Sequence, residues 1–116
     1  MLLNKHPLVI NVELAETIGL NESIIVQQIH YWLEINKKQK KNLKEGRYGT
    51  YNTYLEWQKQ FPFWSVTTIR RIITRLESEG ILISENWNQA KYDRTKWYSI
   101  DYQLLNEIME NKAREH

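Results

Sequence analysis

Residues 65–82 read SVTTIRRIITRLESEGIL, and this stretch decides the fold. Ser65 is a good helix N-cap because its side-chain oxygen can accept a hydrogen bond from a backbone N–H of the first turn. Gly80 can adopt the left-handed conformation that ends many helices, so the pattern predicts a helix over about 65–79. At about 100° per residue, apolar and polar side chains separate onto opposite sides. The apolar side holds Val66, Ile69, Ile72, Ile73 and Leu76, and the polar side holds Thr67, Arg71, Thr74 and Ser78, flanked by Arg70 and Arg75.

The segment before this helix predicts the first helix of a helix-turn-helix. Asn52 or Thr53 can cap a short helix, TYLEWQKQF, and Pro62 ends it. Only a tight turn then separates it from Ser65, so we expect a helix-turn-helix over about 53–79. Its packed face is expected to hold Tyr54, Leu55, Trp57, Gln58 and Phe61.

The segment after the helix predicts a β-hairpin. Residues 81–87, ILISENW, and 95–100, TKWYSI, read as strands because their side chains alternate in character. The polar segment NQAKYDR joins them, which gives a hairpin, or wing, over about 81–100. The other expected elements are a helix over 12–18, a stop at Gly19, a helix over about 22–36 capped by Asn21, an exposed lysine-rich loop to Gly46, a short strand over about 47–51, and a helix over about 101–112 capped by Asp101 with Leu104, Leu105, Ile108 and Met109 as its apolar stripe.

This order of elements predicts a mainly α protein with a small β-hairpin, in the α+β class. Specifically, it is typical of a winged helix-turn-helix with an extra C-terminal helix. At 116 residues, 41% of them hydrophobic, we expect a single domain over 1–116. The chain has no cysteine, which suits a reducing cytoplasm, and no apolar run approaches the roughly 20 residues that cross a bilayer. We therefore expect a cytoplasmic protein with no membrane partner.

The polar side of the central helix is the first candidate DNA-binding site. Exposed side chains on the second helix of such a motif can reach base edges in the major groove. Arg71 is the main base-reading candidate because arginine can donate two hydrogen bonds to guanine, and Thr67 and Thr74 lie beside it. Candidate contacts to the DNA backbone on the same helix are Ser65, Thr68, Arg70 and Arg75. The alternative is an ordinary solvated face, in which the arginines pair with Glu77 and Glu79.

Two further basic segments are candidate phosphate contacts. The wing carries Lys91, Tyr92, Arg94 and Lys96, which can lie along phosphates or enter the minor groove. Residues 37–47 carry a net charge of +5, whereas residues 1–36 carry −3. The candidates in this basic segment are Lys37, Lys38, Lys40, Lys41 and Lys44. Both segments also fit ordinary solvated turns.

The sequence gives catalysis little support. The only aspartates are Asp93 and Asp101, and the histidines His6, His30 and His116 have no metal-ligand or triad spacing. There is also no glycine-rich phosphate loop. We expect no enzyme, no metal and no cofactor.

Three runs carry a resemblance to a known family: LNESIIVQQIHYWL, YNTYLEWQKQFPFWSVTTIRRIITRLESEGIL and KYDRTKWYSIDY. Over roughly residues 6–104 the chain resembles the winged-helix domain of replication proteins of Gram-positive phages, plasmids and other mobile elements. This group is related to the N-terminal domain of DnaD-like primosome proteins and to phage replisome organisers. The resemblance implies binding to origin or primosomal DNA and recruitment of a polymerase, primase, helicase or helicase loader. It assigns the DNA role to Ser65, Thr67, Thr68, Arg70, Arg71 and Arg75.

Three functions remain open from the sequence. The first is an accessory DNA-binding protein in replication of a mobile element, because longer members of the group add a second domain. It would bind duplex DNA, with single-stranded DNA as an alternative, and its N-terminal helices would contact a replication enzyme or form a homodimer. The second is a winged-helix transcriptional repressor, which would bind a palindromic operator as a dimer. The third is a protein–protein interaction module that retains the fold.

Overall fold

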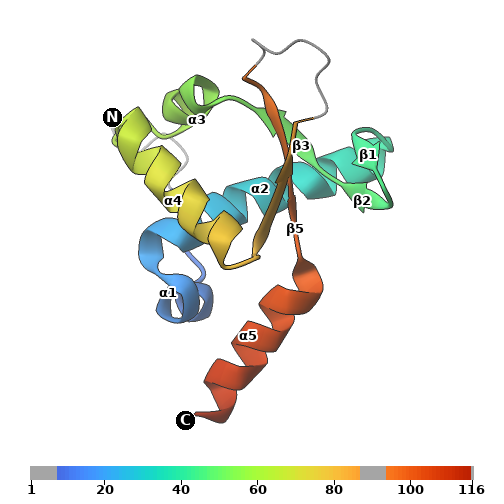
Figure 1. Cartoon of the computed structure of the whole chain (residues 1–116). Helices are drawn as coiled ribbons and strands as arrows, with labels where there is room; N and C mark the ends of the chain where they lie inside the picture. Colours follow the sequence, from blue (N-terminus) through green and yellow to red (C-terminus); the bar gives the residue numbers. More distant parts are fainter. Residues whose placement is uncertain (1–7, 87–93, 116) are drawn as a thin grey trace.

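The computed structural model describes residues 8–86 and 94–115, and it has the predicted α+β character. Figure 1 shows the helices grouped around a small sheet, with α5 extending from the end of β5. The elements are α1 Val12–Ile18, α2 Leu20–Gln39, β1 Leu43–Lys44, β2 Arg47–Tyr48, β3 Thr50–Asn52, α3 Tyr54–Gln60, α4 Val66–Ser78, β4 Leu82–Glu85, β5 Lys96–Ile100 and α5 Tyr102–Arg114.

The predicted caps at Thr53, Ser65 and Asp101 are confirmed. The side chain of each accepts a hydrogen bond from the backbone N–H three residues later. At Thr53 the side chain of Glu56 also accepts from the Thr53 backbone N–H, which completes a capping box. These local hydrogen bonds fix where α3, α4 and α5 begin.

Gly80 ends α4 in a Schellman motif, as the glycine stop predicted. Its φ is +81°, and its N–H donates to the Glu77 carbonyl at 3.1 Å. The N–H of Ile81 donates to the Leu76 carbonyl at 3.1 Å, so two otherwise unpaired carbonyls of the last turn are satisfied. The chain then turns directly into β4.

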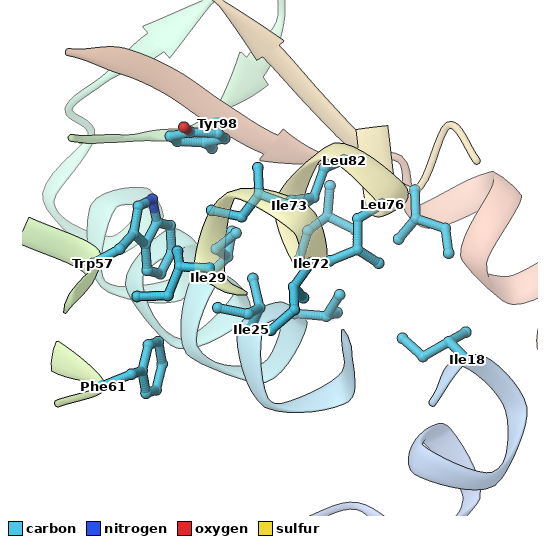
Figure 2. Close-up of a cluster of buried hydrophobic side chains, with 14 of the residues drawn as sticks. Ile18, Ile25, Ile29, Trp57, Phe61, Ile72, Ile73, Leu76, Leu82 and Tyr98 are labelled. Carbon is cyan, nitrogen blue, oxygen red and sulfur yellow. The ribbon is translucent and has the colours of Figure 1, made fainter. Parts of the chain in front are cut away.

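The apolar side of α4 forms the centre of the core (Figure 2). Ile69, Ile73 and Leu76 are fully buried and Ile72 is nearly so, whereas Val66 at the first turn is half-buried. The core also includes, from the other elements, Ile25 and Ile29 of α2, Trp57 of α3, Phe61, Leu82 of β4 and Tyr98 of β5. Burying side chains of this size stabilises the fold by about 1.5–3 kcal/mol each, so the orientation of α4 is firmly set.

The packed face predicted for α3 is correct except at one residue. Trp57 and Phe61 are fully buried, and Tyr54 and Gln58 are half-buried. Leu55 is 66% exposed, so its assignment to the packed face was wrong. It lies about 100° from Tyr54 and about 200° from Trp57 around the helix, and a helix of this length buries only one side.

The predicted hairpin over 81–100 is present as β4 and β5, which pair antiparallel from Leu82↔Ile100 to Glu85↔Trp97. β3 pairs with the other edge of β5, which gives the strand order β3-β5-β4. Both sides of β5 are covered. Tyr98 and Ile100 belong to the core, while Ser99 donates to the Tyr48 carbonyl in β2 at 2.6 Å.

The region predicted as an exposed loop is ordered structure, so that prediction was wrong. α2 continues to Gln39, where positive side chains near its end favour the negative end of the helix dipole. The expected strand over about 47–51 is divided between β2 and β3, and β1 pairs with β2 through a turn in which Glu45 and Gly46 have φ of 49° and 80°. Positive φ at both central residues is the geometry of a tight hairpin turn.

The predicted cap of α2 was also wrong. Asn21 lies inside α2, and Gly19, with φ +107°, is both the last residue of α1 and the cap of α2. The Gly19 N–H donates to the Ala15 carbonyl at 2.9 Å, and its own carbonyl accepts from Ser23 at 2.9 Å. A single glycine therefore serves two helices, and α2 starts two residues earlier than expected.

α5 carries the predicted apolar stripe but packs only along one edge of the molecule. It contacts α1, and Leu105, Ile108 and Met109 are partly buried against the core. The helix ends at Arg114, slightly later than predicted. Within the described residues, no helix has the length and apolar character needed to span a bilayer.

Candidate nucleic-acid interface

The outer face of α4 consists of exposed side chains without a structural task. Thr67, Arg71 and Thr74 are exposed, as periodicity predicted, and they lie opposite the buried isoleucines of the same helix. Arg71 makes no ion pair with any residue in 8–86 or 94–115. Its guanidinium therefore keeps its hydrogen-bond donors available for a ligand.

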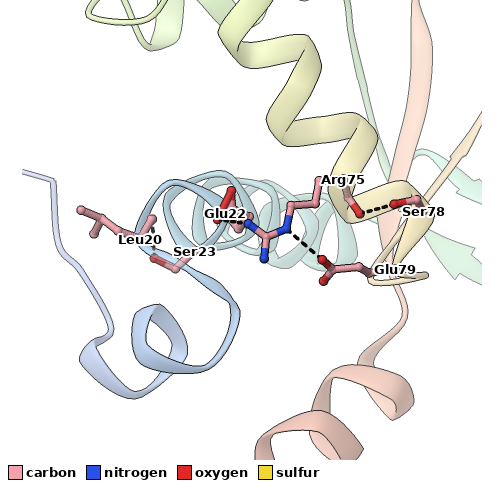
Figure 3. Close-up of polar contacts among 6 residues, drawn as sticks. All are labelled: Leu20, Glu22, Ser23, Arg75, Ser78 and Glu79. Atoms are coloured by element: carbon pink, nitrogen blue, oxygen red, sulfur yellow. Dashed lines mark hydrogen bonds and ion pairs between the residues drawn. The ribbon is translucent and has the colours of Figure 1, made fainter.

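Arg75, at one flank of this face, is already paired. Figure 3 shows its guanidinium between two carboxylates, with Nη1 3.3 Å from Glu22 of α2 and Nε 2.9 Å from Glu79. The hydrogen bond to Glu79 and the charge of Glu22 raise the pKa of Arg75. Its side chain is still 56% exposed, but the two acids offset its charge. The assignment of Arg75 to a phosphate contact stays a prediction.

Arg70, at the opposite flank, lies over an aromatic ring that the sequence pattern did not mark as part of the site. Its Cζ is 5.1 Å from the centre of the Tyr54 ring in α3, and Lys96 Nζ is 5.6 Å from the same ring. Cations over a tyrosine face are attracted by its π electrons. Tyr54 thus brings a cation of α4 and a cation of β5 to one place.

Glu77 is the acidic neighbour of this cluster. Its carboxylate lies 3.9 Å from Lys96 Nζ and accepts a hydrogen bond from the Ser84 hydroxyl of β4. These contacts tie α4 to the β4–β5 hairpin, and they partly offset the charge of Lys96. Arg94, just before β5, is exposed and makes no ion pair with another described residue. Lys91 and Tyr92 lie outside the described residues.

The first turn of α4 uses its two hydroxyl residues for capping. Ser65 Oγ accepts from the Thr68 N–H at 3.1 Å and donates to Thr68 Oγ1 at 3.1 Å. Just before this turn, Phe63 is 58% exposed and packs edge-on against Trp64, with ring centres 4.9 Å apart. Phe63 is an exposed aromatic at the N-terminal end of α4 that the sequence pattern did not single out.

The lysine-rich segment lies on the other side of the molecule from α4. In Figure 1, α4 and the β1–β2 hairpin are at opposite ends of α2. The five candidate lysines and Arg47 are all exposed, with Lys37 and Lys38 in the last turn of α2. The structure therefore does not join this segment to the outer face of α4 in one surface.

Among the described residues, no three acidic or histidine side chains come together as metal ligands. His30 instead joins two helices, because its Nδ1 lies 2.7 Å from the Tyr102 hydroxyl at the start of α5. In comparisons with known proteins, no family model, no curated protein and no solved structure matches this chain.

Proposed function

We propose that this chain is a winged-helix DNA-binding protein that acts as an accessory factor in replication of a mobile element. The outer face of α4 is proposed to enter the major groove of duplex DNA, and the β4–β5 hairpin to follow the adjacent phosphates. One observation carries the proposal: Arg71, Thr67 and Thr74 are exposed on a helix whose other side is locked into the core. The order α3, tight turn, α4 and hairpin supports the same reading.

The side chains divide into two chemical roles. Arg71 can donate two hydrogen bonds to a guanine edge, while Thr67 and Thr74 can contact a thymine methyl group or a phosphate. Arg70, Lys96 and Arg94 suit phosphates, because they flank the helix on the hairpin side. Roughly three phosphate contacts would make the logarithm of affinity fall with the logarithm of salt at a slope of about −3.

The role in replication is supported by the resemblance to winged-helix replication proteins of mobile elements. An accessory replication protein and a repressor use the same face of the fold, but they differ in selectivity. A repressor needs roughly a thousandfold or greater preference for its operator over random DNA. Selection of bound sites from a random duplex library should therefore return weak preferences here, and a strong palindrome would instead favour a repressor.

Titration with labelled DNA tests the DNA-binding proposal. The purified protein is titrated against a duplex of about 20 base pairs, and against one of its strands, at about 50 and about 200 mM salt. Arg71→Gln is the test variant, and Arg114→Gln, an identical change near the end of α5, is the matched control. We expect tighter binding to duplex than to single strand, and a loss of about fivefold or more with Arg71→Gln only. Equal affinities for the two variants would overturn the assignment of α4 as the DNA-binding face.

A further inference from the structure

The strongest positive surface of the protein is separate from α4. We define the lysine surface as Lys37, Lys38, Lys40, Lys41, Lys44 and Arg47. All of its side chains are exposed, and none forms an ion pair within the described part of the chain. The only acid within this stretch is Glu45. Unlike Arg75 and Lys96, these cations are not offset by a paired carboxylate.

The backbone beneath the lysine surface is firmly held. Asn42 O accepts from the Gly49 N–H at 3.1 Å and from Trp97 Nε1 at 3.2 Å. The buried Asn36 side chain donates to the Gly49 carbonyl at 2.7 Å. Lys40 and Asn42 have φ of 54° and 61°, in the left-handed region that side chains other than glycine seldom occupy. A loop that served only as a solvated connection would not require this fixed geometry.

The distance along α2 separates the lysine surface from the outer face of α4. Glu22, near the start of α2, contacts Arg75 at the flank of that face. Lys38 lies sixteen residues later in the same helix, which at about 1.5 Å per residue is about 24 Å away. A duplex bound to α4 therefore leaves the lysine surface free at the far end of α2 (Figure 1).

We infer that the lysine surface is a second nucleic-acid site, which binds the phosphate backbone of another DNA segment without reading its bases. Lysines suit this role because they act as mobile point charges for phosphate rather than as planar donors for base edges. A protein with two such surfaces can hold two DNA segments at once. That bridging step rests on the proposed function of α4, whereas phosphate binding by the lysine surface does not.

A two-step bead experiment tests both surfaces. One duplex is fixed to beads, the protein is bound and the beads are washed, and a second, fluorescent duplex is then added. The test variant is Lys41→Gln with Lys44→Gln, and its matched control is Lys112→Gln with Arg114→Gln on α5. The native protein and the control should retain the second duplex. The test variant should stay on the beads through α4 but retain at least about fivefold less of the second duplex, because two phosphate contacts are lost.

The salt dependence of retention gives a second readout. Each lost phosphate contact reduces the slope by about 0.9, so two lost contacts change the effect of a fourfold rise in salt by about 12-fold. If the test variant retains the second duplex as its control does, the inference is overturned, including the case in which a dimer bridges through two copies of α4. If Arg71→Gln still binds the beads normally while the test variant does not, the lysine surface stands and the proposed role of α4 fails.

Discussion

A methyl group at Gly49 is expected to destabilise the protein by about 2–4 kcal/mol. A Cβ at this position would lie 2.2 Å from Cε2 and from Nε1 of Trp97. The indole cannot move aside freely, because Trp97 is 2% exposed and its Nε1 donates to the Asn42 carbonyl. Overpacking costs about 1–3 kcal/mol, and loss of the indole hydrogen bond adds about 1 kcal/mol.

Urea unfolding followed by circular dichroism measures this cost, with Gly46→Ala as the matched control. Gly46 has no atom within 4 Å of its Cβ position, so alanine there meets only the strain of a φ of +80°, which costs about 1–2 kcal/mol. Gly49→Ala should therefore be the more destabilising variant. It should also change the aromatic circular dichroism, because it displaces Trp97. A Gly49→Ala variant as stable as Gly46→Ala would refute the close packing of Gly49 against Trp97.

Three further outcomes follow from individual contacts. Ser65→Ala should reduce the free energy of unfolding by about 1 kcal/mol through loss of the α4 cap, while Ser65→Asn should retain most of it; equal losses would contradict a capping role. Glu22→Gln should raise duplex affinity about two- to fivefold, because it releases Arg75 for phosphate, and no gain relative to Glu110→Gln would contradict that reading. Burial, with the nearby Tyr54 and Glu77, raises the pKa of Tyr98, so its neutral form stabilises the fold fully below about pH 10 and this stabilisation is lost as the pH rises through the folded-state pKa. Tyr98→Phe should therefore lose stability less steeply than the native protein above about pH 10, and equal slopes in pH-dependent urea unfolding would contradict this.

The boundaries of α4 were predictable because its start and stop signals are local. Ser65 and Gly80 act on backbone groups within a few residues of themselves, and sequence periodicity alone separates the buried isoleucines from Arg71. The same local reasoning failed at Asn21. It resembles a cap by residue type, but Gly19 adopts a conformation that ends one helix and starts the next.

Contacts between distant parts of the chain explain what the sequence could not indicate. The β1–β2 hairpin is anchored through Asn42 to Trp97, fifty-five residues away, so its local composition resembled a solvated loop. The pairing of Arg75 with Glu79 has helical i,i+4 spacing, but its contact with Glu22 depends on how α2 and α4 pack. The place of Tyr54 beside Arg70 likewise depends on the packing of α3 against α4.

Mapping the bound duplex onto the protein by NMR tests the central claim most directly. In a ¹⁵N-labelled sample, addition of a duplex of about 20 base pairs at about 50 mM salt should shift the amide signals of Thr67, Arg71 and Thr74 first. Signals at the β4–β5 hairpin should shift with them, and those of the buried side of α4 should change less. Shifts confined to α1 and α5, with α4 unchanged at saturating DNA, would contradict a DNA-binding role for the outer face of α4.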